Sequence, residues 1–80
     1  MNLEIKIFAT LRKYGPSETA LGDSFKIKIE GDHISDVIDE LKIPPDERLI
    51  VLVNGVRVIN FQQTVENDDL VVFFPQLGGG

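Results

Sequence analysis

The chain has 80 residues, and because 42% of them are hydrophobic it contains enough apolar side chains for one small core and is not intrinsically disordered. Charged residues make up 26% of the chain and leave no apolar run long enough to span a membrane. Eight Lys and Arg against thirteen Asp and Glu give a net charge of −5, which disfavours binding to nucleic acid or to an anionic membrane surface.

Cysteine is absent from the sequence. Disulfide bonds, thiolate metal sites, a nucleophilic cysteine and a cysteine persulfide are therefore excluded. Residues 1–7 alternate between polar and apolar side chains and lack the basic start and the long apolar segment of a signal peptide. We therefore expect a cytoplasmic protein.

The first part of the chain predicts two paired strands and a short helical turn. Residues 2–8 alternate between apolar and polar side chains, which is typical of a half-buried strand. Residues 25–30 alternate in the same way, and the turn residues between the two segments favour an antiparallel pair with a long loop. A helical turn through residues 11–13 fits into this loop before Gly15-Pro16 ends it.

A helical period begins at Asp32 and predicts one amphipathic helix that covers the sheet. The apolar stripe of this helix consists of Ile34, Val37, Ile38 and Leu41. Either Asp32 or Ser35 is placed to cap its N-terminus, and Pro44-Pro45 prevent its continuation. The predicted helix therefore spans about three turns.

Three further strands are predicted in the second half of the chain. The continuous apolar run 49–53 indicates an interior strand that is buried on both faces. Asn54-Gly55 is typical of a tight hairpin into residues 56–58. Residues 70–74 predict the last strand, in which Phe73 and Phe74 point to opposite faces, so at least one of the two is a candidate for exposure.

The order β-β-α-β-(β)-β predicts an α+β fold in which one helix crosses one mixed sheet. A right-handed crossover through the helix places the last strand parallel to the first and beside it, which is the β-grasp arrangement. Residues 1–75 are expected to form this domain, and residues 76–80 a flexible C-terminal tail.

Few residue patterns in the chain suggest catalysis. The single His, His33, lies with Asp32 and Asp36 at the predicted helix start, where such residues more often cap a helix or remain solvated than bind a metal. We therefore expect no metal site and no internal active site. On composition alone, Arg12-Lys13 is interpreted as a solvated pair.

The C-terminal residues, from Pro75 to Gly80, are the most informative part of the sequence. Three final glycines have no side-chain bulk, so this segment is expected to project and to pass through a narrow channel of another protein. The reactive group is then the terminal carboxylate, which must first be activated, for example as an acyl-adenylate made by a separate enzyme that uses ATP and Mg²⁺. The alternative is a terminal segment without a function.

Three segments, residues 8–15, 53–55 and 72–80, together resemble the MoaD/ThiS family of ubiquitin-like β-grasp sulfur carriers. The family's diglycine end is matched by Gly79-Gly80. Gln76 stands where the family usually has a second proline, and Asp68 where its last turn often has glycine. Within the family, the segment after the first strand and the chain length are most similar to the small subunit of molybdopterin synthase.

This resemblance implies that the protein binds no cofactor and catalyses nothing itself. An E1-like enzyme that uses ATP and Mg²⁺ would adenylate Gly80. A sulfur donor, such as a cysteine desulfurase or rhodanese system, would then form a thiocarboxylate. The large subunit of molybdopterin synthase, expected in a heterotetramer, would transfer this sulfur to precursor Z in the biosynthesis of the molybdenum or tungsten cofactor.

The resemblance also directs attention to a partner-binding surface, because aromatic residues and Arg anchor interfaces well. The candidates are Phe8, Arg12, Phe61, Phe74, Pro75, Leu77 and Gly78. Three alternatives remain open: a carrier for the thiamine, cysteine or transfer RNA pathway, a ubiquitin-like modifier joined to lysines through Gly80, and a binding module whose tail has no role.

Overall fold

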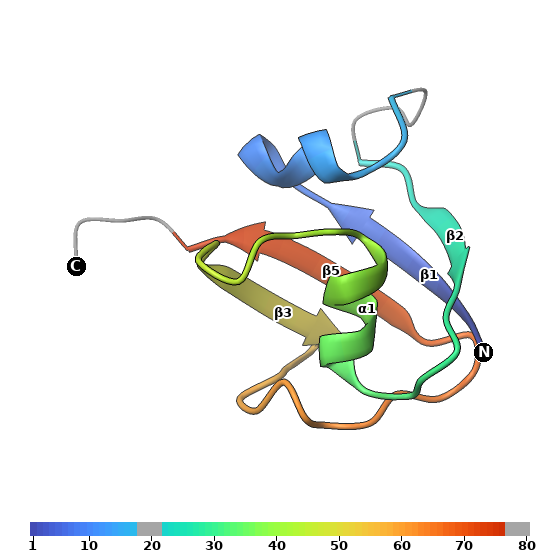
Figure 1. Ribbon diagram of the computed structural model, residues 1–80. Helices are drawn as coiled ribbons and strands as arrows, with labels where there is room; N and C mark the ends of the chain where they lie inside the picture. The colour runs from blue at the N-terminus through green and yellow to red at the C-terminus, as the bar shows by residue number, and fades with distance from the viewer. Residues whose placement is uncertain (18–21, 77–80) are drawn as a thin grey trace.

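The computed structural model describes residues 1–17 and 22–76 (Figure 1). Its regular elements are the strands β1 (Asn2–Ile7), β2 (Phe25–Lys28), β3 (Leu49–Val53), β4 (Val56–Arg57) and β5 (Leu70–Pro75), the 3-10 helix η1 (Ala9–Tyr14) and the α-helix α1 (Ile34–Glu40). Both helical segments and all five strands were expected from the residue pattern. Of the predicted tail, only Gln76 belongs to the described residues.

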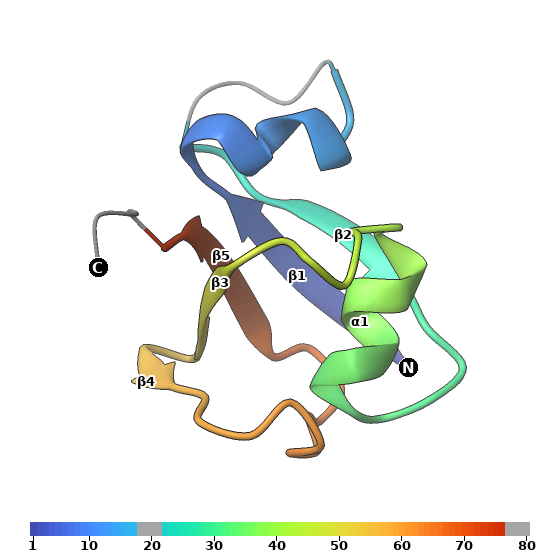
Figure 2. The same ribbon diagram turned by 60° about the vertical axis from the view of Figure 1, so that its left-hand side comes forward.

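The five strands form one mixed sheet in the order β2-β1-β5-β3-β4. β1 pairs antiparallel with β2 and parallel with β5, so the first and last strands lie side by side in the middle of the sheet. α1 lies across one face of this sheet, as the two views in Figures 1 and 2 show. The predicted β-grasp fold is therefore confirmed.

The core fills the space between α1 and the sheet. The largest fully buried side chains are Leu3, Ile5, Leu11, Ile34, Val37, Val51, Val71 and Phe73. Those from the strands occupy alternate positions, because successive side chains of a strand point to opposite faces. Each fully buried side chain of this size contributes about 1.5–3 kcal/mol to folding.

The prediction that residues 49–53 are buried on both faces is wrong. In β3 only Val51 is buried, and Ile50 and Leu52 are half-buried. The strand with consecutive buried residues is β5, at 71–73, because β5 lies between two long strands in the sheet. The neighbour of β3 on its other side is β4, which has only two residues.

The helix is shorter than predicted and has a different cap. α1 has seven residues, and its N-cap is His33 rather than Asp32 or Ser35. The backbone N–H of His33 donates a hydrogen bond of 3.0 Å to the Asp36 carboxylate, which closes the first turn. The helix ends before the prolines because Lys42 adopts a left-handed conformation, with φ of 58°.

Candidate partner-binding face

The sheet face turned away from α1, called the back face below, carries the side chains at the alternate strand positions that do not enter the core. An apolar patch lies on this face and consists of Phe8, Ile50, Leu52, Val72 and Phe74. The strand register brings these residues together, because Val72 pairs with Leu52 and Phe74 pairs with Ile50. Four members of the patch are half-buried, and Val72 at its centre is 8% exposed.

Phe8 and Phe74 form one end of the apolar patch. Their rings are stacked, with centroids 4.8 Å apart and planes 7° from parallel. The backbone N–H of Phe8 also bonds to the carbonyl oxygen of Phe73 at 3.0 Å, which holds the chain after β1 against β5. The patch therefore has a rigid aromatic end of the kind that anchors protein interfaces.

The C-terminal segment begins beside this aromatic end. Pro75 pairs with Leu49, and the N–H of Gln76 donates to the carbonyl oxygen of Arg48 at 3.1 Å. The chain thus continues its pairing with the β3 side one residue beyond β5. A groove of about 430 Å³ borders this point and is lined in part by Thr10, Arg48 and Gln76.

The predicted site residues fall into four groups, of which the fourth, Phe61, is described in the next paragraph. Phe8, Phe74 and Pro75 come together at one end of the sheet, as the preceding contacts show. Arg12 is half-buried on η1 and lines a small cavity with Asp23 and Phe25 at the start of β2. The predictions for residues 77–80, which include Leu77, Gly78, Gly79 and Gly80, lie outside the described residues.

Phe61 lies on the α1 side of the sheet and is separated from the Phe8–Phe74 stack. Its carbonyl oxygen accepts a 2.9 Å hydrogen bond from the N–H of Ser35. Its side chain packs against the core and lines an apolar groove together with Ile38 and Leu49. Any contact that Phe61 makes with a partner is therefore on a different side of the sheet from the apolar patch.

The residue pattern did not predict Ile50, Leu52 and Val72 as surface residues. The apolar run 49–53 was interpreted as buried on both faces, which is common when helices cover both sides of a sheet. The sequence predicts only one amphipathic helix, however, and one such helix covers one face of a sheet. The prediction of a single covering helix was therefore the signal that could have identified Ile50 and Leu52 as members of a partly exposed patch.

The Asp36 carboxylate caps the start of α1 beside His33. The Nδ1 atom of His33 is 3.1 Å from Asp32 Oδ1 and 3.3 Å from Asp36 Oδ2. The backbone N–H of His33 is the main reason that the pKa of the Asp36 carboxyl lies below its usual range. These contacts are those of a capped helix start, in which the carboxylate satisfies an N–H without an intrahelical partner.

Within residues 1–17 and 22–76, no helix is long and apolar enough to cross a membrane.

Comparison with known proteins assigns the chain to a family. A sequence model described as the ThiS family matches residues 5–80, which is nearly the whole chain. No curated protein sequence matches the chain.

Solved structures share the fold. SAMP1 from Haloferax volcanii is 22% identical, with a TM-score of 0.71 over 100% of both chains. A second structure of this small archaeal modifier protein 1 is 21% identical, with a TM-score of 0.71 over 95% of this chain and 98% of the other. A chain from the complex of subunits 1 and 2 of the molybdopterin-converting factor of Helicobacter pylori is 15% identical, with a TM-score of 0.65 over 100% of both chains.

Proposed function

The chain belongs to the ThiS family, and we propose that it is a sulfur carrier that acts as the small subunit of molybdopterin synthase. The observation that carries this proposal is the position of the apolar patch at the base of the C-terminal segment. The Phe8–Phe74 stack lies directly before Pro75, from which the chain continues to its three final glycines. A partner that covers the patch thus lies next to the end of β5, from which the C-terminal segment starts.

The proposed chemistry takes place at the terminal carboxylate of Gly80. An E1-like enzyme with ATP and Mg²⁺ forms the acyl-adenylate and releases pyrophosphate. The outer sulfur of a donor persulfide then displaces AMP, and a thiol reduces the resulting acyl disulfide to release the thiocarboxylate. Because the chain contains no cysteine, this carbonyl is the proposed place for the transferred sulfur.

The folded domain contributes recognition to this reaction, while the partners contribute catalysis. The proposed partners are the adenylating enzyme, a desulfurase or rhodanese sulfur donor, and the large synthase subunit, where the sulfur enters precursor Z. The structural similarity to a chain of the two-subunit factor of Helicobacter pylori supports the large subunit as a partner. The proposed location of the protein is the cytoplasm.

A ubiquitin-like modifier is the second candidate function, and the similarity to the small archaeal modifier protein favours it specifically. Both functions begin with the same adenylate. They differ in the final acceptor, because a modifier transfers the Gly80 carbonyl to the amine of a target lysine. Carriage of sulfur to another acceptor, in the thiamine, cysteine or transfer RNA pathway, shares every step up to the thiocarboxylate.

Intact mass spectrometry of the protein isolated from its own cells tests the proposal. We expect a fraction of the chains in which sulfur replaces one oxygen at Gly80, located by fragmentation. Reconstitution with precursor Z and the large subunit then identifies the acceptor. Gly80 joined to target lysines would establish the modifier instead, and a terminus that stays unmodified with the adenylating enzyme and Mg-ATP would contradict both functions.

A further inference from the structure

A row of four residues across the back face has a cation at each end. Lys6 of β1 pairs with Val72 of β5, Val72 pairs with Leu52 of β3, and Leu52 pairs with Arg57 of β4. Residues paired in this way point to the same sheet face. Neighbouring strands lie about 4.8 Å apart, so Lys6 and Arg57 border the centre of the apolar patch from its two sides.

The edge of the sheet next to Lys6 adds further positive charge to this face. Lys26 and Lys28 alternate along β2 with Phe25 and Ile27, which pack against the core, so both lysines lie on the back face. Two carboxylates lie with these lysines. Glu4 is on the same face and accepts a 2.7 Å hydrogen bond from the Ser24 hydroxyl, and Asp68 lines a groove together with Glu4 and Lys26.

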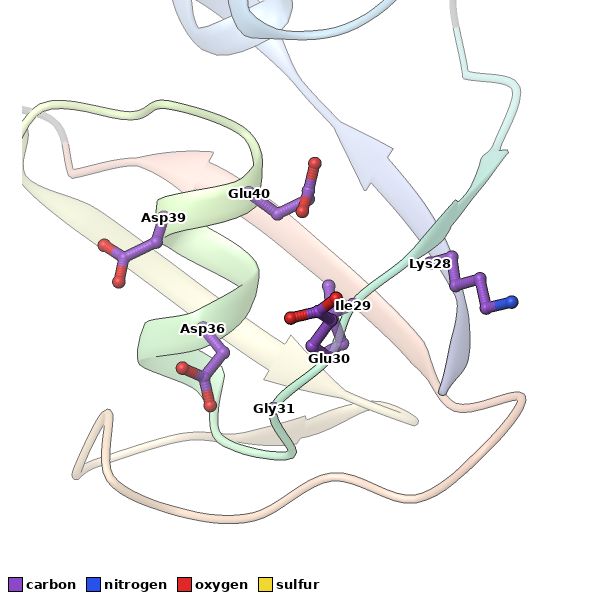
Figure 3. A pocket seen from close by; sticks show the side chains of 7 residues that line it. All are labelled: Lys28, Ile29, Glu30, Gly31, Asp36, Asp39 and Glu40. Atoms are coloured by element: carbon purple, nitrogen blue, oxygen red, sulfur yellow. The ribbon is translucent and has the colours of Figure 1, made fainter.

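Negative charge gathers on the other side of the molecule. Asp36, Asp39 and Glu40 of α1 line a shallow groove of about 610 Å³ beside the end of β2, and Lys28 and Glu30 border the same groove. Figure 3 shows the side chain of Lys28 pointing away from these three carboxylates. A chain with a net charge of −5 therefore places two cations, Lys6 and Arg57, beside its apolar patch.

We propose that Lys6 and Arg57 are specificity-determining residues that select a partner surface with an apolar centre and a carboxylate on each side of it. This inference rests on the proposed function, in which the adenylating enzyme and the large subunit cover the patch. A partner with cations at these positions would bury like charges against each other. A partner with neutral residues at these positions would leave both cations desolvated without a counter-charge.

The same charges disfavour a second copy of this chain as the occupant of the patch. Two back faces in contact would each present four basic residues, Lys6, Lys26, Lys28 and Arg57, against the two carboxylates of Glu4 and Asp68, and none of the α1 carboxylates. The excess of like charge would repel, which keeps the patch available to other proteins. The occupant is therefore a different protein with acidic residues around its apolar contact surface.

Single charge reversals test this proposal. Lys6→Glu and Arg57→Glu each reverse one cation beside the patch, and Lys42→Glu, at an exposed position after α1, changes the net charge equally. The probe is the E1-like adenylating enzyme of the same organism, and the readout is the association rate constant at about 0.02 and 0.2 M salt. Thermal unfolding of each variant establishes that it is folded.

We expect Lys6→Glu and Arg57→Glu each to slow association roughly tenfold relative to Lys42→Glu at low salt, and the difference to narrow at high salt. Equal rates for all three variants would overturn the inference, as would a wild-type dimer formed through the back face. If the enzyme adenylates wild type and both reversals equally well, the proposed function stands without this selectivity. If wild type is not adenylated, the proposed function fails and the inference with it.

Discussion

The stacked rings of Phe8 and Phe74, with centroids 4.8 Å apart, connect the end of β1 to the end of β5. The two strands are parallel neighbours, so both phenylalanines lie at the same end of the sheet. Phe73, the residue before Phe74, is fully buried against the core on the other face. One dipeptide therefore supplies a core residue and a surface anchor beside the C-terminal segment.

Loss of this anchor is expected to affect binding more than stability. Phe74→Ala removes the stack, which is worth about 0.5–1.5 kcal/mol beyond its buried area, and is expected to weaken binding to the adenylating enzyme more than about tenfold. Phe73→Ala is expected to cost about 3–5 kcal/mol of unfolding free energy. Calorimetric titration measures the affinity for the adenylating enzyme, and urea unfolding measures the free energy of unfolding.

Phe61→Ala is the matched aromatic control for Phe74→Ala. Because Phe61 packs on the α1 side, we expect its truncation to reduce binding less than that of Phe74. An equal loss of affinity in the two variants would mean that the partner contacts both sides of the sheet.

Deletion of Gly79-Gly80 is expected to abolish activation of the C-terminus and to leave the melting temperature unchanged. The core contains no described residue beyond Phe73, and the last strand ends at Pro75. Pyrophosphate exchange with the adenylating enzyme measures activation, and differential scanning fluorimetry measures stability. A much lower melting temperature for the variant without Gly79-Gly80 would show that these glycines stabilise the fold.

Tyr14 is expected to ionise at higher pH than a free tyrosine. Its hydroxyl donates a 2.8 Å hydrogen bond to the Glu47 carboxylate, and this bond is the main cause of the raised pKa of Tyr14. Because the folded-state pKa is raised, the hydrogen bond stabilises the fold fully below about pH 10, the pKa of an unfolded tyrosine. This stabilisation is lost as the pH rises through the pKa of the folded state. Glu47→Gln should lower the pKa of Tyr14 toward the value of an unfolded tyrosine.

Tyrosinate absorbance measures this pKa directly, because Tyr14 is the single tyrosine of the chain. Glu40→Gln, on α1, is the control for a general change of charge and should leave the titration curve unchanged. A wild-type curve that overlays the curve of the urea-unfolded protein would contradict the hydrogen bond between Tyr14 and Glu47.

The helix start is expected to lose stability in acid. The backbone N–H of His33 bonds to Asp36 and holds the pKa of that carboxyl low, so its stabilisation is present above the ordinary carboxyl pKa of about 3.9. That stabilisation is lost as pH falls through the lower folded-state pKa. Urea unfolding measures the free energy of unfolding across this pH range. The values for wild type and Asp36→Asn should converge at the acid end, whereas those for Asp39→Asn should run parallel to wild type.

Gly31→Ala offers a second test of the same contact. A Cβ atom at Gly31 would collide with the Asp36 carboxylate, which must then move away from the His33 N–H. We expect a lower melting temperature for Gly31→Ala, and little further loss when Asp36→Asn is added. Full additivity of the two changes would mean that they act independently.

The strand pattern could be predicted because it depends on local sequence. Alternation in residues 2–8 predicted β1 and its inward face, since a strand's side chains alternate whatever surrounds it. The helix cap was predicted wrongly, because Asp32 and Ser35 are both common N-cap residue types and His33 is not. The choice depends on where the chain enters from β2 and on the isolated bridge between His33 and Thr64.

The amino-acid sequence by itself determined which segments form strands, that one helix covers one sheet, and that the chain ends in Gly79-Gly80. Only the tertiary structure decided that β5 is the central strand, that the apolar patch is partly exposed, and that Lys6 and Arg57 border it. The physical reason is that secondary structure follows from the spacing of neighbouring residues, whereas burial depends on which elements lie above and beside a strand. That arrangement arises from pairings between residues far apart in the chain, such as Lys6 with Val72.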